Sequence, residues 1–113
     1  MEMRDIIITI PKKIKWSEYQ KELDLVEDWS HVMNFKVPHL PTESGKGQRC
    51  YMVYDGKVVG WMKIVGFSEQ TITCSTTGKV WIGKFIQRSG PFHKLETEVT
   101  MKGFQGFRYQ TDV

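Results

Sequence analysis

The hydrophobic positions of the chain change their period twice, and each change predicts a different element. Residues 5–10 read DIIITI, a β-branched apolar run that stops at Pro11. β-branched side chains favour strands, and proline lacks the amide hydrogen that a strand ladder needs. We expect a buried strand over residues 5–10.

Large apolar side chains then recur at steps of three and four between Ser17 and about His31: Tyr19, Leu23, Val26 and Trp29. This spacing places them on one face of an amphipathic helix. Ser17, with Gln20 three residues later, fits a capping box at the start of that helix. We expect one main N-terminal helix whose aromatic stripe packs in the core.

Residues 37–48 (VPHLPTESGKGQ) contain two prolines, two glycines and several small polar side chains. This composition predicts a long irregular loop. Because loops of this length are uncommon in compact domains unless they serve a site, the loop is the first functional candidate.

After the loop the period becomes two. Residues 49–54 and 57–66 flank Asp55-Gly56, a pair that favours the type I′ turn of a β-hairpin. The remaining pattern predicts strands over 70–74 and 79–88 joined by a turn at 75–78, a break at Gly90-Pro91, weak alternation over 95–101 and a last strand over 104–109.

These elements indicate an α+β fold, because an early strand and helix precede five or six short antiparallel strands. A chain of 113 residues is long enough for one domain with one core. We expect a single domain over residues 1–113. Its sheet should be small, curled and mostly antiparallel, or a pseudo-barrel, with one main N-terminal helix.

Positive charge and aromatic rings gather in the same part of the chain. Residues 1–33 carry five Lys/Arg against seven Asp/Glu, whereas residues 34–113 carry eleven against six. Most of the aromatic residues stand on predicted strands of the positive part. Rings beside positive charge suit a nucleic acid, although the charge also fits a solubilising surface and the rings also fit a barrel core.

The sequence argues against several common kinds of site. Cys50 and Cys74 are too few for a disulfide framework and have no metal-ligand spacing, and the three histidines are equally scattered. Gly45-Lys46-Gly47 lacks the phosphate-loop spacing, and no serine-hydrolase elbow occurs. No apolar run is long enough for a membrane helix, and no signal-peptide pattern is present. We expect a cytoplasmic protein with no metal, no cofactor and no membrane partner.

The residues around the first turn carry a family resemblance. Residues 51–61 (YMVYDGKVVGW) resemble the PUA-like superfamily, which includes the PUA, ASCH and EVE domains, and residues 78–83 and 103–109 are compatible with the same plan. The resemblance implies binding of RNA or of modified bases in DNA. Some ASCH members hydrolyse acylated nucleosides with a lysine, a threonine and a glutamate, although the ASCH signature G-x-K-x-x-D/E-x-R is absent from this chain.

Our leading hypothesis is a nucleic-acid-binding module, for RNA or DNA, that accepts a modified or flipped base in an aromatic pocket between sheet and loop. Trp61 and Trp81 adjoin glycines on their strands, Gly60 and Gly83, which would leave room for a stacked base, and Phe107 is a third candidate. Five basic residues would contact phosphates: Lys46, Arg49, Lys84, Arg88 and Arg108.

The loop would form one wall of that pocket and contributes His39 and Ser44. The same loop supports an alternative hypothesis, in which the protein is a small amidohydrolase acting on a modified nucleoside. Lys46 would be its base or nucleophile, Thr42 its hydroxyl partner and Glu43 its acid/base, provided that burial lowers the lysine pKa. A third hypothesis is a protein–protein interaction domain that uses a sheet edge or an aromatic face. The sequence leaves the oligomeric state open.

Overall fold

The computed structural model describes residues 3–73, 78 and 80–110, and within them the chain forms one helix and six strands. The elements follow one another as β1 (Ile6–Thr9), α1 (Trp16–Val26), β2 (Met33–Val37), β3 (Arg49–Tyr54), β4 (Lys57–Thr73), β5 (Val80–Thr100) and β6 (Phe107–Tyr109). In this described part, no helix is long and apolar enough to cross a membrane.

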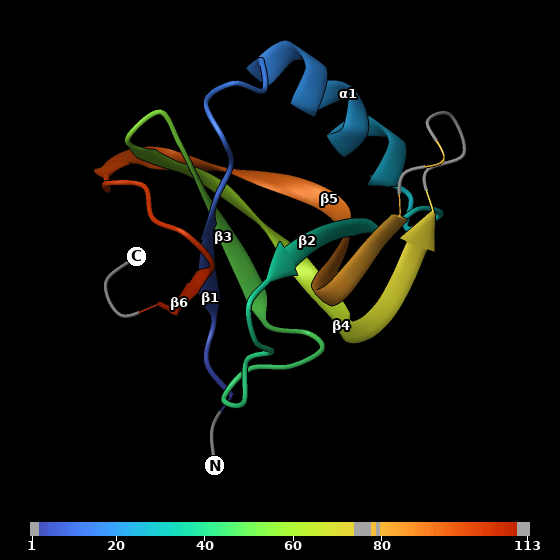
Figure 1. Ribbon diagram of the computed structural model, residues 1–113. Helices are drawn as coiled ribbons and strands as arrows, with labels where there is room; N and C mark the ends of the chain where they lie inside the picture. The colour runs from blue at the N-terminus through green and yellow to red at the C-terminus, as the bar shows by residue number, and fades with distance from the viewer. Residues whose placement is uncertain (1–2, 74–77, 79, 111–113) are drawn as a thin grey trace.

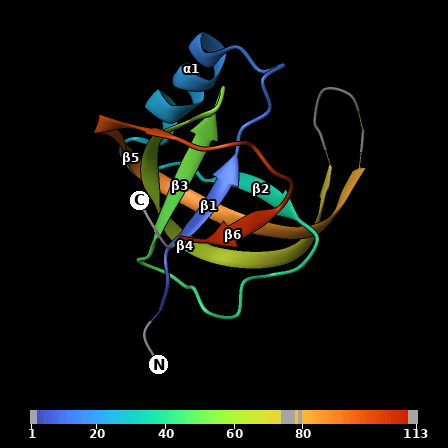
Figure 2. The same ribbon diagram turned by 90° about the vertical axis from the view of Figure 1, so that its left-hand side faces the viewer.

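The described strands form one curled sheet in the order β2-β5-β4-β3-β1-β6. β1 lies parallel to β3, and the other neighbouring pairs are antiparallel. Figures 1 and 2 show β4 and β5 bending around the shorter strands, so that the sheet forms a half-barrel with α1 beside it. The expected α+β class, with a curled, mostly antiparallel sheet and one main N-terminal helix, is confirmed.

The parallel pair explains where the helix lies. β1 pairs with β3 from Ile6 opposite Cys50 to Thr9 opposite Val53. Parallel neighbours need a long crossover connection, because a tight turn can join only antiparallel strands. α1, β2 and the loop of residues 38–48 make up this connection, which brings the helix across one face of the sheet.

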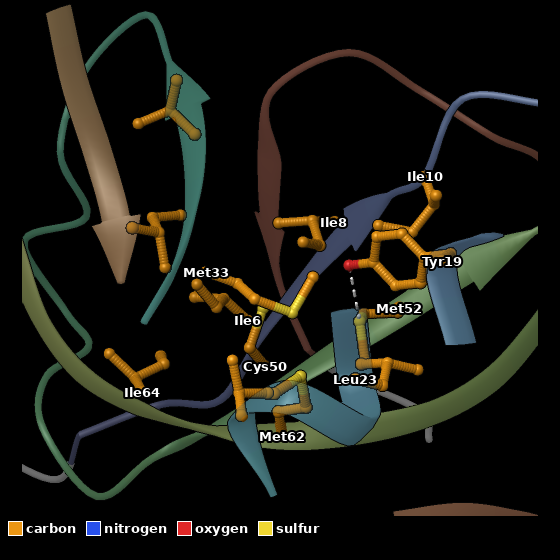
Figure 3. Close-up of a cluster of buried hydrophobic side chains, with 13 residues drawn as sticks. Ile6, Ile8, Ile10, Tyr19, Leu23, Met33, Cys50, Met52, Met62 and Ile64 are labelled. Carbon is orange, nitrogen blue, oxygen red and sulfur yellow. Dashed lines mark hydrogen bonds between the residues drawn. The ribbon is translucent and has the colours of Figure 1, made fainter. Parts of the chain in front are cut away.

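The sheet buries side chains on both faces, and the alternation of β1 sorts them. Ile6 and Ile8 pack in the main core with Tyr19 of α1 (Figure 3). Ile7 points the other way, into a smaller cluster with Tyr51. We call the α1 side the inner face and the opposite side the outer face. Because both faces are covered at β1, its sequence is a continuous apolar run rather than an alternating one.

The turn at Asp55-Gly56 is confirmed as type I′, since both residues have positive φ, 52° and 77°. Behind the turn the pairing shifts at a β-bulge, between Val53 opposite Val58 and Met52 opposite Gly60. The extra residue reverses the side-chain alternation of β4 beyond it, because strand side chains have a period of two.

The helix is shorter than its apolar spacing predicts. α1 ends five residues before His31, and Trp29 has a φ of 68°, a left-handed backbone that a right-handed helix does not contain. The predicted capping box is also wrong. Lys15 is the N-cap without a side-chain hydrogen bond, and Gln20 donates instead to Asp24.

The sheet differs from prediction at several strand ends. The pattern missed β2, which precedes the loop and pairs with β5. The predicted strands 57–66 and 70–74 belong, as far as they are described, to β4. Those over 79–88 and 95–101 belong, as far as they are described, to β5, except that Met101 lies beyond its last residue. The predicted break is wrong: Gly90 adopts a φ of 87° against the Trp29 ring, and β5 continues through Pro91. Residues 75–77 of the predicted turn lie outside the described residues.

Candidate functional site

A row of paired side chains crosses the outer face of the sheet from β6 to β5. The strand register places five residues directly opposite one another in turn: Arg108, Ile7, Tyr51, Trp61 and His93. Directly opposite residues of neighbouring strands point to the same face. Ile7 and Tyr51 are buried, Trp61 is half-buried, and Arg108 and His93 are exposed. The row therefore has a buried middle and accessible ends.

Trp61 makes a contact with each neighbouring strand. Its ring stacks on His93 of β5, with centroids 4.0 Å apart and planes 14° from parallel. The guanidinium carbon of Arg49, on β3, lies 4.1 Å from the Trp61 ring centroid, a cation–π contact. Arg49 also donates to the Tyr51 hydroxyl at 3.3 Å. Lys63 lies opposite Arg49 on the same face. We call these four residues, Arg49, Trp61, Lys63 and His93, the outer cluster.

The cations of this face have no carboxylate ion-pair partner among the described side chains. The ion pairs found there are Arg4–Glu43, Lys12–Asp55 and Lys84–Glu69. Arg49, Lys63 and Arg108 belong to none of them, and the Arg108 guanidinium lies over the Phe104 ring at 4.4 Å. Positive charge on the outer face therefore remains available to an external anion.

Two of the three predicted stacking residues lie on opposite faces. Trp61 belongs to the outer face, whereas Phe107 lies opposite Ile8 on the inner side. The Phe107 ring meets His39 and Tyr109 edge-on, at 5.2 Å and 5.6 Å between centroids. Trp61 and Phe107 therefore cannot stack on the same base. The backbone of Trp81 belongs to β5, and its side chain lies outside the described part of the chain.

The glycines beside the tryptophans do not leave open space, contrary to our expectation. A Cβ at Gly60 would collide with the Phe92 ring, and one at Gly83 would come within 2.8 Å of the Lys36 side chain. The absence of a side chain at these positions accommodates Phe92 and Lys36. Neither glycine therefore provides the open space that we expect for a stacked base.

The predicted phosphate contacts do not gather at one place. Arg49 and Arg108 share the outer face, and Lys84 lies on β5 in its ion pair with Glu69. Arg88 is buried on the inner face, with only 2% of its surface exposed. Of these four residues, Arg49 and Arg108 lie on the face that carries Trp61.

The loop of residues 38–48 is fastened to β6. The Tyr109 hydroxyl accepts the backbone N–H groups of Thr42 and Glu43 at 2.9 Å and 3.0 Å. Burial raises the pKa of Tyr109, but these hydrogen bonds outweigh it and lower the pKa below its ordinary value. Lys46 is exposed, and the buried Ser44 hydroxyl has no hydrogen-bond partner in the described part. The loop thus presents the lysine to solvent, without the burial that a catalytic base would need.

Sequence reasoning missed Tyr51 and His93. His93 lies opposite Trp61 only because β5 continues through Gly90-Pro91, where the pattern predicts a break. Tyr51 lies opposite Trp61 only because of the bulge in β4. The hairpin turn indicates the approximate register of β3 and β4, but no residue type in the sequence marks the bulge.

Other chemistry is sparse among the described residues. No group of three or more His, Cys, Asp or Glu side chains there could hold a metal ion. Burial raises the pKa of the Cys50 thiol to about 12, so Cys50 is protonated and a poor nucleophile at neutral pH.

Comparisons with protein-family models, curated proteins and solved structures gave no match to this chain.

Proposed function

We propose that this protein binds single-stranded nucleic acid, RNA or DNA, through the outer cluster. The observation that supports this most is the layering of guanidinium, indole and imidazole by Arg49, Trp61 and His93 on an accessible sheet face. Lys63 and Arg108 add positive charge to that face. Sheets that carry rings and basic side chains on one face are a common platform for single strands.

Bases would bind at the ends of this stack rather than on Trp61 itself. The Trp61 ring already has partners from β3 and β5, so the accessible surfaces belong to Arg49 and His93. A base that stacks on either extends the layers, and each such contact contributes roughly 1–3 kcal/mol for any base type. Lys63 and Arg108 would contact phosphates, which fix position without reading sequence.

A modified or flipped base fits the same proposal. A base that has left its duplex exposes both of its faces and can join a stack, whereas a paired base cannot. The binding experiment therefore includes an unmodified single strand, the same strand with one modified base, and the matching duplex with and without a mismatch.

Fluorescence anisotropy of labelled oligonucleotides tests the proposal. We expect single strands to bind more tightly than the duplex, and affinity to fall with salt because phosphate binding releases counterions. Arg49→Gln should weaken single-strand binding about tenfold, since it removes both a stacking surface and a charge. Lys63→Gln, which removes one of the proposed phosphate contacts, should make the slope of log K against log salt shallower by about 0.7.

Lys84→Gln is the matched control, because it removes one half-buried positive charge outside the outer cluster. Its affinity should stay within about twofold of the unaltered protein at moderate salt. The proposal is overturned if no oligonucleotide binds at low salt, or if Lys84→Gln weakens binding as much as Arg49→Gln.

A further inference from the structure

A cavity of about 500 Å³ lies on the inner face, beneath α1. Its walls come from α1, from the segment that follows β1, and from β2 and β5; they include Ile10, Ile14, Tyr19, Val26, Phe35 and Arg88. Figure 1 shows α1 beside the part of the sheet that contains β2 and β5. The cavity is separate from the outer cluster, since the sheet lies between them.

Arg88 is the cation in this wall, and it is almost completely enclosed. One of its terminal nitrogens donates to the Tyr19 hydroxyl at 2.9 Å and to the Met52 sulfur at 3.2 Å. The Tyr19 hydroxyl in turn donates to the same sulfur, the contact drawn in Figure 3. Arg88 Nε is buried with no hydrogen-bond partner in the described part of the chain. These partners are neutral, so none of them balances the charge.

A buried guanidinium without a counter-ion is an unfavourable arrangement. Arginine does not lose its proton in proteins, so it cannot escape the desolvation by becoming neutral. Glu22 also lines the cavity, but it is an exposed residue and forms no ion pair with Arg88. The Glu22 carboxylate acts on Arg88 only from a distance and helps to raise its pKa, so no close ionic partner among the described side chains offsets the burial of the charge.

The chemistry of the walls selects the kind of anion that could fill this role. Arg88 retains a free Nε–H, and a guanidinium pairs with a carboxylate through two parallel hydrogen bonds. A phosphate dianion would need a second cation, whereas the described residues of the wall include one cation, Arg88, together with the acidic Glu22. Most of the remaining wall is apolar, and the exposed Leu25 and Val32 side chains extend it outward.

We propose that this cavity binds a small monocarboxylic acid with an aromatic or aliphatic body, whose carboxylate pairs with Arg88 and whose body packs against Ile14, Val26 and Phe35. The volume of about 500 Å³ is within the range of small-molecule sites. Binding would supply the directly hydrogen-bonded negative charge that Arg88 lacks among the described side chains. The site is independent of nucleic-acid binding, because it uses the opposite face of the sheet.

Isothermal titration calorimetry and NMR with phenylacetate and hexanoate test this proposal, with phenylacetamide as the uncharged control. We expect both acids to bind, the amide to bind at least about tenfold more weakly, and the Arg88 Nε–H resonance to shift on addition of acid. Arg88→Met, which keeps an unbranched side chain without charge, should abolish the difference between acid and amide. Arg49→Gln should leave acid binding unchanged.

The NMR measurement on the unaltered protein keeps the test decisive even if Arg88→Met does not fold. Failure of both acids to bind at millimolar concentration would overturn the proposal. Equal affinity for acid and amide, or acid binding that shifts residues of the outer cluster but not Arg88, would also overturn it. None of these results bears on the oligonucleotide experiment, so the two proposals can fail separately.

Discussion

The two faces of the sheet use arginine in opposite ways. On the outer face, Arg49 holds its guanidinium in an exposed position over Trp61. On the inner face, Arg88 is enclosed beside the Tyr19 hydroxyl and the Met52 sulfur. An exposed charge is screened by water and salt and can attract a polyanion, whereas an enclosed charge interacts strongly over a short range. The face on which an arginine lies therefore determines the kind of anion that it can bind.

The sharpest test of this difference is the effect of truncation on stability. Arg88→Ala leaves a cavity and removes the donor to the Tyr19 hydroxyl, so the free energy of unfolding should fall by about 3 kcal/mol. Arg49→Ala removes an exposed contact and should lower it by less than about 1 kcal/mol. Urea denaturation measures both.

Arg88→Met serves as the control for this pair, because it fills most of the volume without burying a charge. It should recover most of the stability lost in Arg88→Ala. Similar losses for Arg49→Ala and Arg88→Ala would show that the two environments do not differ in the way the contacts suggest.

Glycine substitutions give the next largest expected difference. At Gly60 a Cβ would meet the His93 carbonyl oxygen and the Phe92 ring, neither of which can move freely, so Gly60→Ala should cost about 2 kcal/mol. At Gly83 the Cβ would meet only the flexible end of Lys36, so Gly83→Ala should change stability by about 0.5 kcal/mol or less. Thermal or urea unfolding of the two variants checks this order. A larger loss of stability in Gly83→Ala than in Gly60→Ala would contradict it.

The buried Cys50 thiol gives a pH-dependent test of the inner face. Its ordinary pKa is 9.0, and burial raises the pKa to about 12 in the folded protein. Between these values the unfolded chain loses a proton that the folded chain keeps, so the thiol contributes less stability as pH rises. The loss approaches 1.4 kcal/mol per pH unit, roughly, once the unfolded thiol is ionised.

Urea denaturation at pH about 8 and about 10 measures this loss, with Cys50→Ala as the reference. Other groups titrate in both proteins, and so the difference between the two pH changes isolates Cys50. Stability that falls by the same amount in both proteins would mean that the folded thiol ionises as readily as the unfolded one.

The smallest effect is expected at the floor of the outer cluster. Tyr51→Phe removes the hydroxyl that accepts from Arg49 at 3.3 Å and leaves the ring in place. Stability should fall by about 0.5 kcal/mol and oligonucleotide affinity by less than about threefold, because the guanidinium still contacts Trp61. Anisotropy and urea denaturation measure the two effects, and a tenfold loss of affinity would assign Tyr51 a larger part in binding than its burial suggests.

Local sequence signals located the elements that depend on local chemistry. The β-branched run before Pro11 marked β1, and Asp55-Gly56 located the hairpin because a type I′ turn requires positive φ at both residues. The apolar spacing predicts the helix but extends it too far, because the spacing reaches Trp29 although that residue leaves the helical conformation. The strand β2 was missed because it lies at the sheet edge and alternates only over five residues.

The candidate site was only partly accessible to the same reasoning. The sequence indicates Arg49 and Trp61 as binding residues, and they lie together, whereas it predicts Arg88 as a phosphate contact and this residue is buried. Charge and residue type do not tell which face of a curled, two-sided sheet a side chain will occupy. That choice depends on the strand neighbours, which are distant in sequence.

The sequence by itself determined the fold class, the early helix and the first hairpin, because these depend on residue types within a few positions of one another. Only the tertiary structure decided where the chemistry lies. One extra residue in β4 shifts the register so that Trp61 meets Tyr51 on the outer face, and without the bulge its side chain would point to the inner face. The continuation of β5 through Gly90 then adds His93. Register decides which face a side chain occupies, because a shift of one residue moves every side chain of the strand to the opposite face.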